Sequence, residues 1–301
     1  MWIVISGASG LVGTALTEAL RGEGHAVARL VRSGQTASAD EIPWDPAVGI
    51  IDSAAMEGAD AVVNLSGANI AAGRWTARRK EILRSSRLRP TRLLVETMGR
   101  LRQKPRVFLS ASATGYYGNR GDEILTEASA PGSDFLAALA RDWEAEAMRA
   151  ESAGTRAVIL RFGVILSKSG GALPRMLLPF RLGIGGRFGN GAQWMPWVAL
   201  DDVTGAIRFL IANEEIRGPV NIVAPHPSTN AEFTRALARA VHRPAVLPAP
   251  AFMLHLALGE MTDALLGSQR ARPARLLAAG YSWHYDELEP ALTGIVQGLS
   301  N

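Results

Sequence analysis

A glycine-rich turn near the start of the chain restricts the fold more than any other feature. The apolar run Trp2–Ser6 leads into the sequence GASGLVG and then into Leu11–Arg21, whose apolar residues have helical spacing. In a strand–turn–helix unit, glycines at these positions permit the tight turn, the close approach of a phosphate and the packing of helix on strand. Free N–H groups and the helix dipole then attract a dinucleotide. The alternative is a tight turn that binds no ligand. The predicted contacts are Gly7, Ser9, Gly10, Leu11, Val12 and Gly13.

The order of periodic segments predicts an α/β protein. Short apolar runs alternate with helical segments in the first half, which is typical of βαβ units and a parallel sheet. We therefore expect a Rossmann-type doubly wound parallel sheet with a smaller C-terminal substrate lobe. The dinucleotide-binding domain is expected over residues 1–165, with returns near 198–225, and the lobe with its helical extension over 166–301. The predicted strands are Trp2–Ser6, Ala26–Val31, Glu41–Trp44, Ala61–Leu65, Arg106–Ala111, Ala157–Arg161 and Val220–Ala224, and the predicted helices are Leu11–Arg21, Thr91–Gln103, Asp134–Ser152, Asp202–Ala212, Thr229–Val241 and most of Phe252–Ser300.

Composition excludes several classes of site. The chain has no cysteine, so disulfides, thiolate catalysis and cysteine-based zinc sites are impossible, and its five histidines are too scattered to predict a metal site. No apolar run is long enough to cross a membrane and no signal peptide is recognisable, so we expect a cytoplasmic protein. The net charge of +4 comes from dispersed residues, which favours an anionic small molecule over nucleic acid as partner. A homodimer is compatible with the sequence.

The end of the second predicted strand indicates which dinucleotide is bound. An NAD site usually has a carboxylate there for the ribose hydroxyls, but the chain has no acidic residue between Glu23 and Asp40. Arg32 stands at the strand end instead, with Ser33 beside it, and a guanidinium suits a 2′-phosphate. The sequence therefore predicts NADP as cofactor, although Arg32 as a solvated loop residue is the alternative.

Further motifs follow other predicted strands. NLSG at Asn64–Gly67, SASATGYYG at Ser110–Gly118 and RFGVIL at Arg161–Leu166 resemble segments of the extended short-chain dehydrogenases/reductases, in the NAD(P)-dependent epimerase/dehydratase superfamily. WDP at Trp44–Pro46 and the segments Gly183–Asp202 and Gly259–Tyr281 are similar to a subgroup of "epimerase family" proteins with a C-terminal extension of their own. The resemblance covers the whole chain and implies an NADP-dependent oxidoreductase or epimerase of unassigned substrate.

The resemblance also implies which residues line the cofactor. The segments after the strands contribute those residues, and Arg87 is expected to face the same cleft, with a surface position as its alternative. The cofactor residues implied in this way are Asn64, Leu65, Ser66, Gly67, Arg87, Ser110, Arg161, Phe162 and Gly163.

The catalytic pair of the superfamily is missing. Its members use Tyr-x-x-x-Lys on one helix face, where the lysine lowers the tyrosine pKa so that the phenol can exchange a proton. Alignment of Glu144 with the family's glutamate puts Leu136 and Ala140 at those two positions. Ser112 keeps the family's Ser/Thr position and can hydrogen-bond a substrate carbonyl or hydroxyl, or merely cap a turn. Tyr116 and Tyr117 are the candidate phenols, with aromatic packing as their alternative.

The Gly- and Trp-rich segment Ser167–Trp197 is expected to contribute the substrate side, because ligands of open α/β sheets bind beyond the carboxyl ends of the strands. The predicted substrate contacts are Arg175, Gln193, Trp194 and Trp197, and purely structural roles are the alternative. The sequence leaves two functions open. The first is an NADP-dependent oxidoreductase or epimerase acting on a small polar molecule, free or nucleotide-linked. The second is a catalytically silent NADP(H)-binding protein that serves as a redox sensor or an interaction module.

Overall fold

The computed structural model describes residues 1–32 and 38–298, and its centre is an eight-stranded sheet. The strand order is β12-β8-β6-β5-β1-β2-β3-β4, and every neighbouring pair is parallel except β3 and β4. The predicted Rossmann-type α/β sheet is confirmed, with each predicted strand displaced by at most two residues. The strands are β1 (Trp2–Ser6), β2 (Ala26–Arg32), β3 (Glu41–Asp45), β4 (Ile50–Ile51), β5 (Ala61–Asn64), β6 (Val107–Ala113), β8 (Arg156–Phe162) and β12 (Gly218–Ile222).

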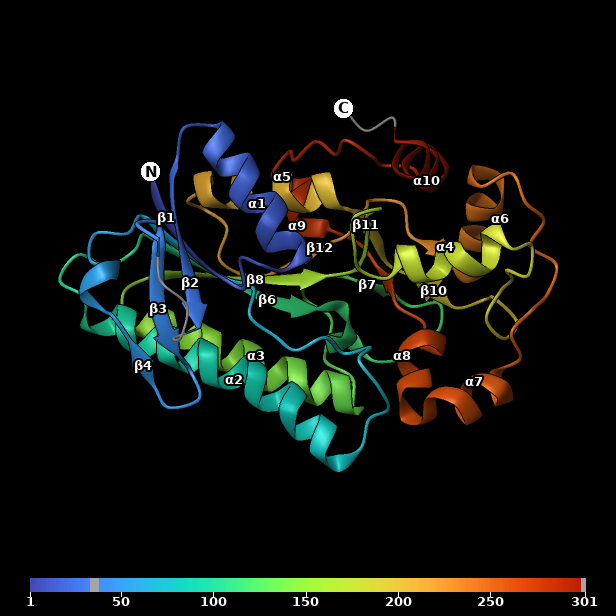
Figure 1. The fold of residues 1–301 in the computed structure, drawn as a ribbon, viewed down its shortest axis with the longest axis horizontal. Coiled ribbons are helices and arrows are strands. Elements are labelled where there is room, and N and C mark those ends of the chain that lie inside the picture. Colours follow the sequence, from blue (N-terminus) through green and yellow to red (C-terminus); the bar gives the residue numbers. More distant parts are fainter. Residues whose placement is uncertain (33–37, 299–301) are drawn as a thin grey trace.

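Helices cover both faces of this sheet (Figure 1). On one face lie α1 (Leu11–Gly22) and α5 (Leu200–Ala212), and on the other lie α2 (Ala77–Arg100) and α3 (Phe135–Ser152). Because β1, β5 and β6 are parallel and in register, Ser6, Asn64 and Ser110 lie side by side at the carboxyl edge. This edge is therefore where the glycine-rich turn and the predicted cofactor segments meet.

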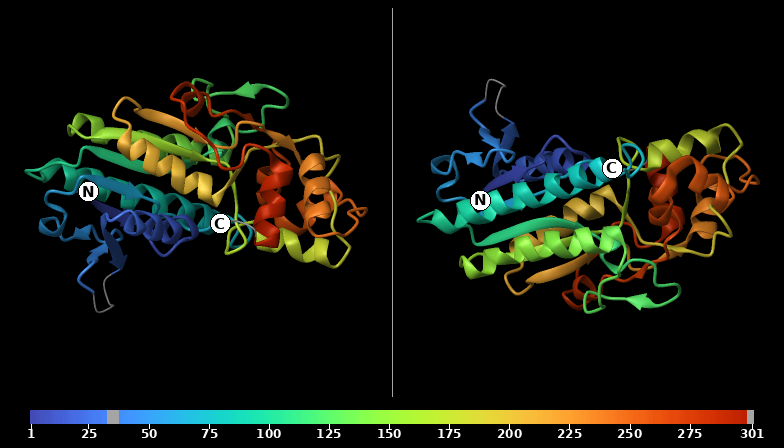
Figure 2. Two further views of the ribbon diagram at one scale, coloured as in Figure 1. Left: turned by 90° about the horizontal axis from the view of Figure 1, so that it is seen from above. Right: turned by 90° about the horizontal axis from the view of Figure 1, so that it is seen from below.

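A smaller lobe lies at one end of the sheet (Figure 2). It contains α4 (Leu173–Arg181), α6 (Asn230–Ala240) and α10 (Leu288–Gln297), and α6 begins with a capping box of Thr229 and Glu232. None of the helices in the described ranges combines the length and apolar character needed to cross a membrane. The remaining elements are β7 (Ile124–Leu125), β9 (Val164–Leu166), β10 (Trp194–Met195), β11 (Trp197–Ala199), β13 (Ser228–Thr229), β14 (Arg270–Ala271), α7 (Ala251–Leu258), α8 (Thr262–Leu266), α9 (Ala274–Ala278) and the short 3-10 helices Ala54–Met56, Thr114–Tyr117 and Gly259–Met261.

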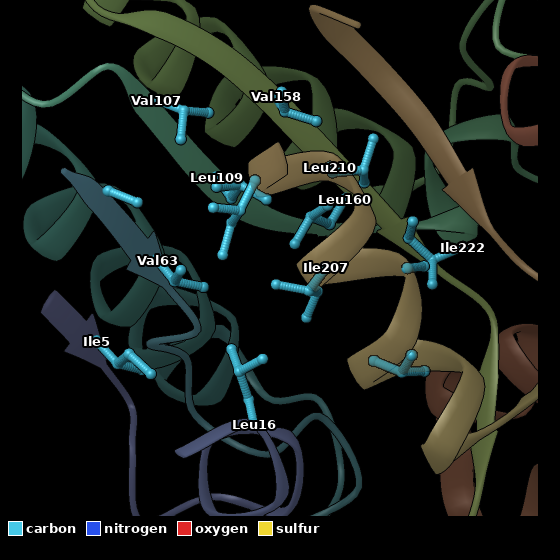
Figure 3. Packing of buried hydrophobic residues seen from close by; sticks show 14 of the residues in the cluster. Ile5, Leu16, Val63, Val107, Leu109, Val158, Leu160, Ile207, Leu210 and Ile222 are labelled. Atoms are coloured by element: carbon cyan, nitrogen blue, oxygen red, sulfur yellow. The ribbon is translucent and has the colours of Figure 1, made fainter. Parts of the chain in front are cut away.

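The core explains why the amino-terminal parts of the central strands are apolar. Successive side chains of a strand point to opposite faces, so a strand covered on both sides reads as a nearly continuous apolar run. Ile3 and Ile5 pack in the core beneath α1 and α5, whereas Val4 packs in the core beneath α2 and α3. Figure 3 shows Ile5, with Leu16 of α1 and Ile207 of α5, in the first of these clusters.

The start of α2 differs from the prediction. The helix begins at Ala77 rather than Thr91, and Pro90 lies inside it. A proline usually ends a helix because it removes a hydrogen bond and clashes with the preceding turn. Here the side chains of Leu83, Pro90 and Leu94 are all buried, so tertiary packing outweighs that preference. The signal for the true start is Thr76, whose side chain accepts a hydrogen bond from the Arg79 N–H as an N-cap.

Candidate functional site

The glycine-rich turn is sterically closed to any larger residue at two positions. Gly7 has φ +70°, and a Cβ there would lie 2.6 Å from the carbonyl oxygen of Leu65. A Cβ on Gly13 would lie 2.3 Å from the carbonyl oxygen of Gly7. Gly10 is the N-cap of α1, no side chain caps this helix, and its first turn has no acidic residue. The N–H groups at the start of α1 are therefore available to a ligand, next to exposed Ser9 and half-buried Leu11 and Val12.

A buried polar chain holds the carboxyl edge of the sheet together. The Asn64 side chain accepts a hydrogen bond from Ser6 Oγ (2.7 Å) and donates to Thr91 Oγ1 (2.8 Å) and Ser110 Oγ (3.4 Å). Asn64 and Ser110 are fully buried, so they shape this edge from within rather than presenting a surface to the cofactor. Leu65 and Ser66 are only half-buried and Gly67 is exposed, so these three remain accessible.

Arg87 lies within α2, beside the exposed segment that follows β5. Its guanidinium donates to the carbonyl oxygens of Leu83 (3.0 Å) and Ala68 (3.2 Å) and lies over the ring of Trp143. Burial, followed by the charge of Arg79, lowers the pKa of Arg87 to about 10, so the group is still a cation at neutral pH. No carboxylate pairs with it among the described residues. Arg87 therefore brings an uncompensated charge to this edge.

Arg32 is exposed at the end of β2 and has no ion pair within the described part of the chain, whereas Arg29 pairs with Asp40 and Glu41. The neighbouring acidic side chains are thus engaged with another arginine, which leaves Arg32 free to meet an anion. Ser33, noted beside it in the sequence, lies outside the described residues.

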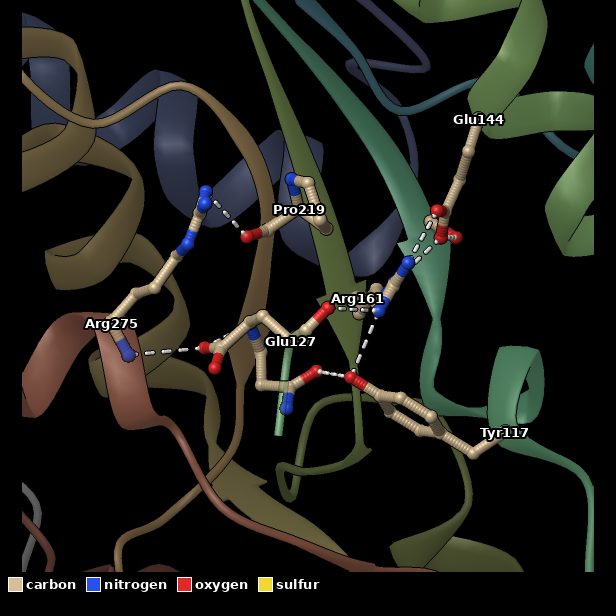
Figure 4. Close-up of polar contacts among 8 residues, drawn as sticks. Tyr117, Glu127, Glu144, Arg161, Pro219 and Arg275 are labelled. Atoms are coloured by element: carbon tan, nitrogen blue, oxygen red, sulfur yellow. Dashed lines mark hydrogen bonds and ion pairs between the residues drawn. The ribbon is translucent and has the colours of Figure 1, made fainter. Parts of the chain in front are cut away.

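The Arg161 side chain lies in a buried polar network at the end of β8. It is 2% exposed, and its guanidinium donates to both carboxylate oxygens of Glu144 (2.9 and 2.8 Å) and to the Tyr117 hydroxyl (3.0 Å), as Figure 4 shows. The Tyr116 ring lies 3.5 Å from the guanidinium carbon. The side chain of this arginine is committed to a buried ion pair, so only its backbone is left for the cofactor contact that the resemblance implies, and that contact stays a prediction. The next two residues, Phe162 and Gly163, are half-buried.

The same network fixes Ser112 and Tyr117. Ser112 is 3% exposed and donates its hydroxyl proton to Glu144 Oε1 (2.6 Å), so it offers only lone pairs to a ligand. Tyr117 is 0% exposed, donates to Asn221 Oδ1 (2.7 Å), and has a pKa raised to about 12, chiefly by burial. Burial and the raised pKa of this phenol favour the alternative of aromatic packing over proton exchange by Tyr117. Tyr116 is half-buried and packs edge-on against Tyr117.

One of the two positions of the family's catalytic pair lies beside this site. A Cβ on Gly115 would lie 3.4 Å from the Cβ of Leu136, which puts Leu136 against the segment that follows β6. Ala140, one turn further along α3, is buried. Two apolar side chains therefore stand where proton transfer would take place in the family.

The four predicted substrate contacts do not form one group. Arg175 is exposed and donates to the carbonyl oxygen of Ala71 (3.4 Å). Gln193 donates to the carbonyl oxygen of Phe188, and Trp194 donates to Asp122 Oδ1 (2.7 Å). Trp197 is 0% exposed in the lobe core, which favours the structural alternative for this residue.

Sequence reasoning missed the buried partners of the site. The sequence motifs assign Glu144 no role in the site. The signal that predicts one is Arg161 itself, because an arginine in a buried strand requires a buried carboxylate as its partner. No local sequence pattern predicts that Asn221 and Glu127 lie beside this site. They meet through the Asn221 N–H and Glu127 Oε1 (3.1 Å), and the Arg275 N–H donates to the same carboxylate (Figure 4).

Comparisons with known proteins agree with this architecture. An epimerase family protein of Mycobacterium bovis, Mb2239, is 44% identical over 291 residues, covering 96% of each chain. The crystal structure of human epimerase family protein SDR39U1 (isoform 2) with NADPH matches with a TM-score of 0.89 and 34% identity, covering 99% of each chain. A nucleoside-diphosphate sugar epimerase of Corynebacterium glutamicum matches with a TM-score of 0.81 and 37% identity, covering 98% of this chain and 58% of the other.

The family matches divide the chain into two stretches. Residues 249–295 match a domain of unknown function (DUF1731), which includes α7 to α9 and most of α10. Residues 3–223 match the NAD dependent epimerase/dehydratase family and include the whole eight-stranded sheet except Trp2, the first residue of β1. The chain therefore belongs to the NAD dependent epimerase/dehydratase family.

Proposed function

We propose that this protein is an NADP(H)-dependent oxidoreductase or epimerase acting on a small polar, free or nucleotide-linked, substrate. The observation that carries the proposal is the turn at Gly7–Gly13, which is closed to any Cβ at both ends and leaves the first N–H groups of α1 free. A turn with no ligand has no need of uncapped N–H groups beside a backbone packed this closely. The residues present therefore fit a diphosphate.

The choice of NADP rests on Arg32. Its exposed guanidinium at the end of β2 has no carboxylate partner in residues 1–32 and 38–298, so it is available to a 2′-phosphate. The NADPH in the human relative supports the same cofactor. Leu65, Ser66, Gly67 and Arg87 are the accessible residues that would line the rest of the dinucleotide.

Ser112 is the residue that would orient the substrate. The Ser112 hydroxyl donates its proton to Glu144, so toward a substrate it can only accept a hydrogen bond. A substrate hydroxyl or amine, which can donate, therefore fits Ser112 better than a carbonyl. NADP supplies hydride transfer when bound. Glu144 is in turn fixed by two hydrogen bonds from Arg161, so Ser112 is held in one orientation toward the edge of the sheet. With Leu136 and Ala140 at the family's proton-transfer positions, the proton must leave through water or a group of the substrate.

Those two apolar positions and the buried Tyr117 also favour a second candidate, a catalytically silent NADP(H)-binding sensor. A substrate screen separates the two. NADPH absorbance at 340 nm, or NADP⁺ reduction, is followed with sugars, nucleotide sugars, aldehydes and ketones. We expect turnover that Ser112→Ala lowers by about 10²-fold, in the range of one lost transition-state contact. Tight NADPH binding with no turnover on any of these compounds would support the sensor.

Replacement of Arg32 by alanine tests the cofactor. We expect the Kd for NADPH to rise about 30-fold and the Kd for NADH to change less than twofold, because only NADPH has the 2′-phosphate whose charge-assisted hydrogen bonds are lost. Calorimetric titration of both nucleotides measures this. Arg29→Ala is the matched control, because Arg29 lies on the same strand but pairs with Asp40 and Glu41. Equal losses for NADH and NADPH would contradict the assignment.

A further inference from the structure

Three arginine side chains surround the turn formed by residues 68–71. Arg79 donates to the carbonyl oxygen of Asn69, Arg87 donates to that of Ala68 (3.2 Å), and Arg175 donates to that of Ala71 (3.4 Å). Arg79 and Arg87 belong to α2 and Arg175 to α4, so two separate elements bring positive charge to one short turn.

Arg79, Arg87 and Arg175 form a cluster whose positive charge is not balanced by acidic side chains of the described residues. None of its three arginines has an ion pair in the described part of the chain, whereas their α2 neighbours Lys80 and Arg84 pair with Glu260 and Asp142. Neutral carbonyl oxygens accept hydrogen bonds but do not cancel charge. In addition, Arg79 Nε is buried without a hydrogen-bond partner among the described residues. A buried donor of this kind is normally satisfied by a ligand or by water.

The start of α2 breaks a local rule in the same place. Anions are favoured at a helix N-terminus and cations are disfavoured, because the helix dipole is positive there. The first turn of α2 nevertheless has no acidic residue and includes Arg78, Arg79 and Lys80. A bound oxyanion would relieve this repulsion, since both the arginines and the helix end would attract it.

The cluster borders the candidate site but is separate from the place of the 2′-phosphate. Ala68 packs in the same apolar cluster as Leu136, the residue at the family's tyrosine position. The turn of residues 68–71 follows β5, whereas Arg32 ends β2, and β1 lies between these two strands. An anion held by Arg79 and Arg175 would therefore lie toward the substrate side of the cofactor.

We propose that Arg79 and Arg175, beside Arg87, bind an oxyanion group of the substrate, a phosphate or a carboxylate. This inference rests on the proposed function, since it names the class of substrate for the same site. Guanidinium groups suit both anions because their N–H groups match two oxygens at once. The substrate is thus an acid or a phosphoester whose reacting hydroxyl faces Ser112.

The test uses inorganic phosphate as the probe and the full-length protein saturated with NADPH. Isothermal titration calorimetry is run at constant ionic strength, adjusted with sodium chloride so that general screening does not change. We expect saturable binding of one phosphate, weakened about tenfold in Arg79→Gln and in Arg175→Gln. The matched controls are Arg89→Gln on α2 and Arg181→Gln on α4, which are both exposed and should stay within twofold of the wild-type protein.

The outcomes distinguish this inference from the proposed function. Absence of saturable phosphate binding to the NADPH-bound protein overturns the inference and leaves the cofactor assignment intact. Binding that occurs only without NADPH overturns it too, because the phosphate then occupies the cofactor's own site. Equal losses in all four variants indicate general charge screening and also overturn it. If NADPH itself does not bind, the proposed function fails, and the same four variants still test the arginine site in the protein without cofactor.

Discussion

Replacing Gly13 with alanine should raise the Kd for NADPH at least about 100-fold, which corresponds to about 2.7 kcal/mol of binding free energy. The added Cβ would lie 2.3 Å from the Gly7 carbonyl oxygen and 2.6 Å from the Ala8 Cα. Both are backbone atoms of the turn, which cannot move aside as a flexible side chain can. The turn must open, and the N–H groups of α1 then lose their position against the diphosphate.

The matched control is Gly22→Ala in the same helix. Nothing lies within 4 Å of a Cβ at Gly22, so this substitution adds the same methyl group without a clash. We expect unchanged NADPH affinity and a free energy of unfolding that stays the same or rises by up to about 1 kcal/mol, since alanine favours the helix over glycine. Isothermal titration calorimetry measures the affinity. Urea unfolding measures the stability of both variants, because overpacking in Gly13→Ala can by itself lower the free energy of unfolding by about 1–3 kcal/mol. Wild-type affinity in Gly13→Ala would falsify the assignment of the turn.

The turn and the sheet are predictable from the sequence because both depend on local patterns. Trp2–Ile5 is apolar at every position since the strand is covered on both faces, and Gly7, Gly10 and Gly13 follow Ser6 at the spacing of a βα turn. The start of α2 shows the limit of this reasoning. Pro90 is a local stop signal, but the burial of Leu83 and Leu94 on either side of it keeps the chain helical.

The site is less predictable than the fold, because its contacts are long-range. Tyr117 and Asn221 are 104 residues apart in the chain, and no local pattern indicates that their side chains meet. Tyr117 was a candidate phenol by position, yet the burial that raises its pKa follows only from the packing of β8, β12 and the Thr114–Tyr117 turn. Conversely, the missing Tyr-x-x-x-Lys pair was evident from the sequence, since Leu136 and Ala140 lie on a helix that was predicted correctly.

Replacing Arg161 with methionine should lower the free energy of unfolding by about 3–5 kcal/mol, because it removes one partner of a buried ion pair. The carboxylate of Glu144 would keep only the hydrogen bond from Ser112, and the Tyr117 hydroxyl would lose its donor. Urea unfolding, followed by circular dichroism, measures the loss. The surface pair of Arg239 and Glu289 (2.7 Å) provides the control, since Arg239→Met should cost less than about 1 kcal/mol.

The pair of Arg161 and Glu144 also explains why a buried charge is retained in the core beside the site. If its role were stability alone, an apolar pair would serve as well, since desolvation of two ions offsets most of their attraction. We therefore expect the double variant Arg161→Met, Glu144→Met to recover at least half of the stability lost in Arg161→Met. The double variant should still fail to restore turnover, and Ser112→Ala should no longer lower its activity, because the Ser112 hydroxyl has lost the acceptor that orients it. A double variant that regains full stability and full turnover would show that the ion pair does not position Ser112.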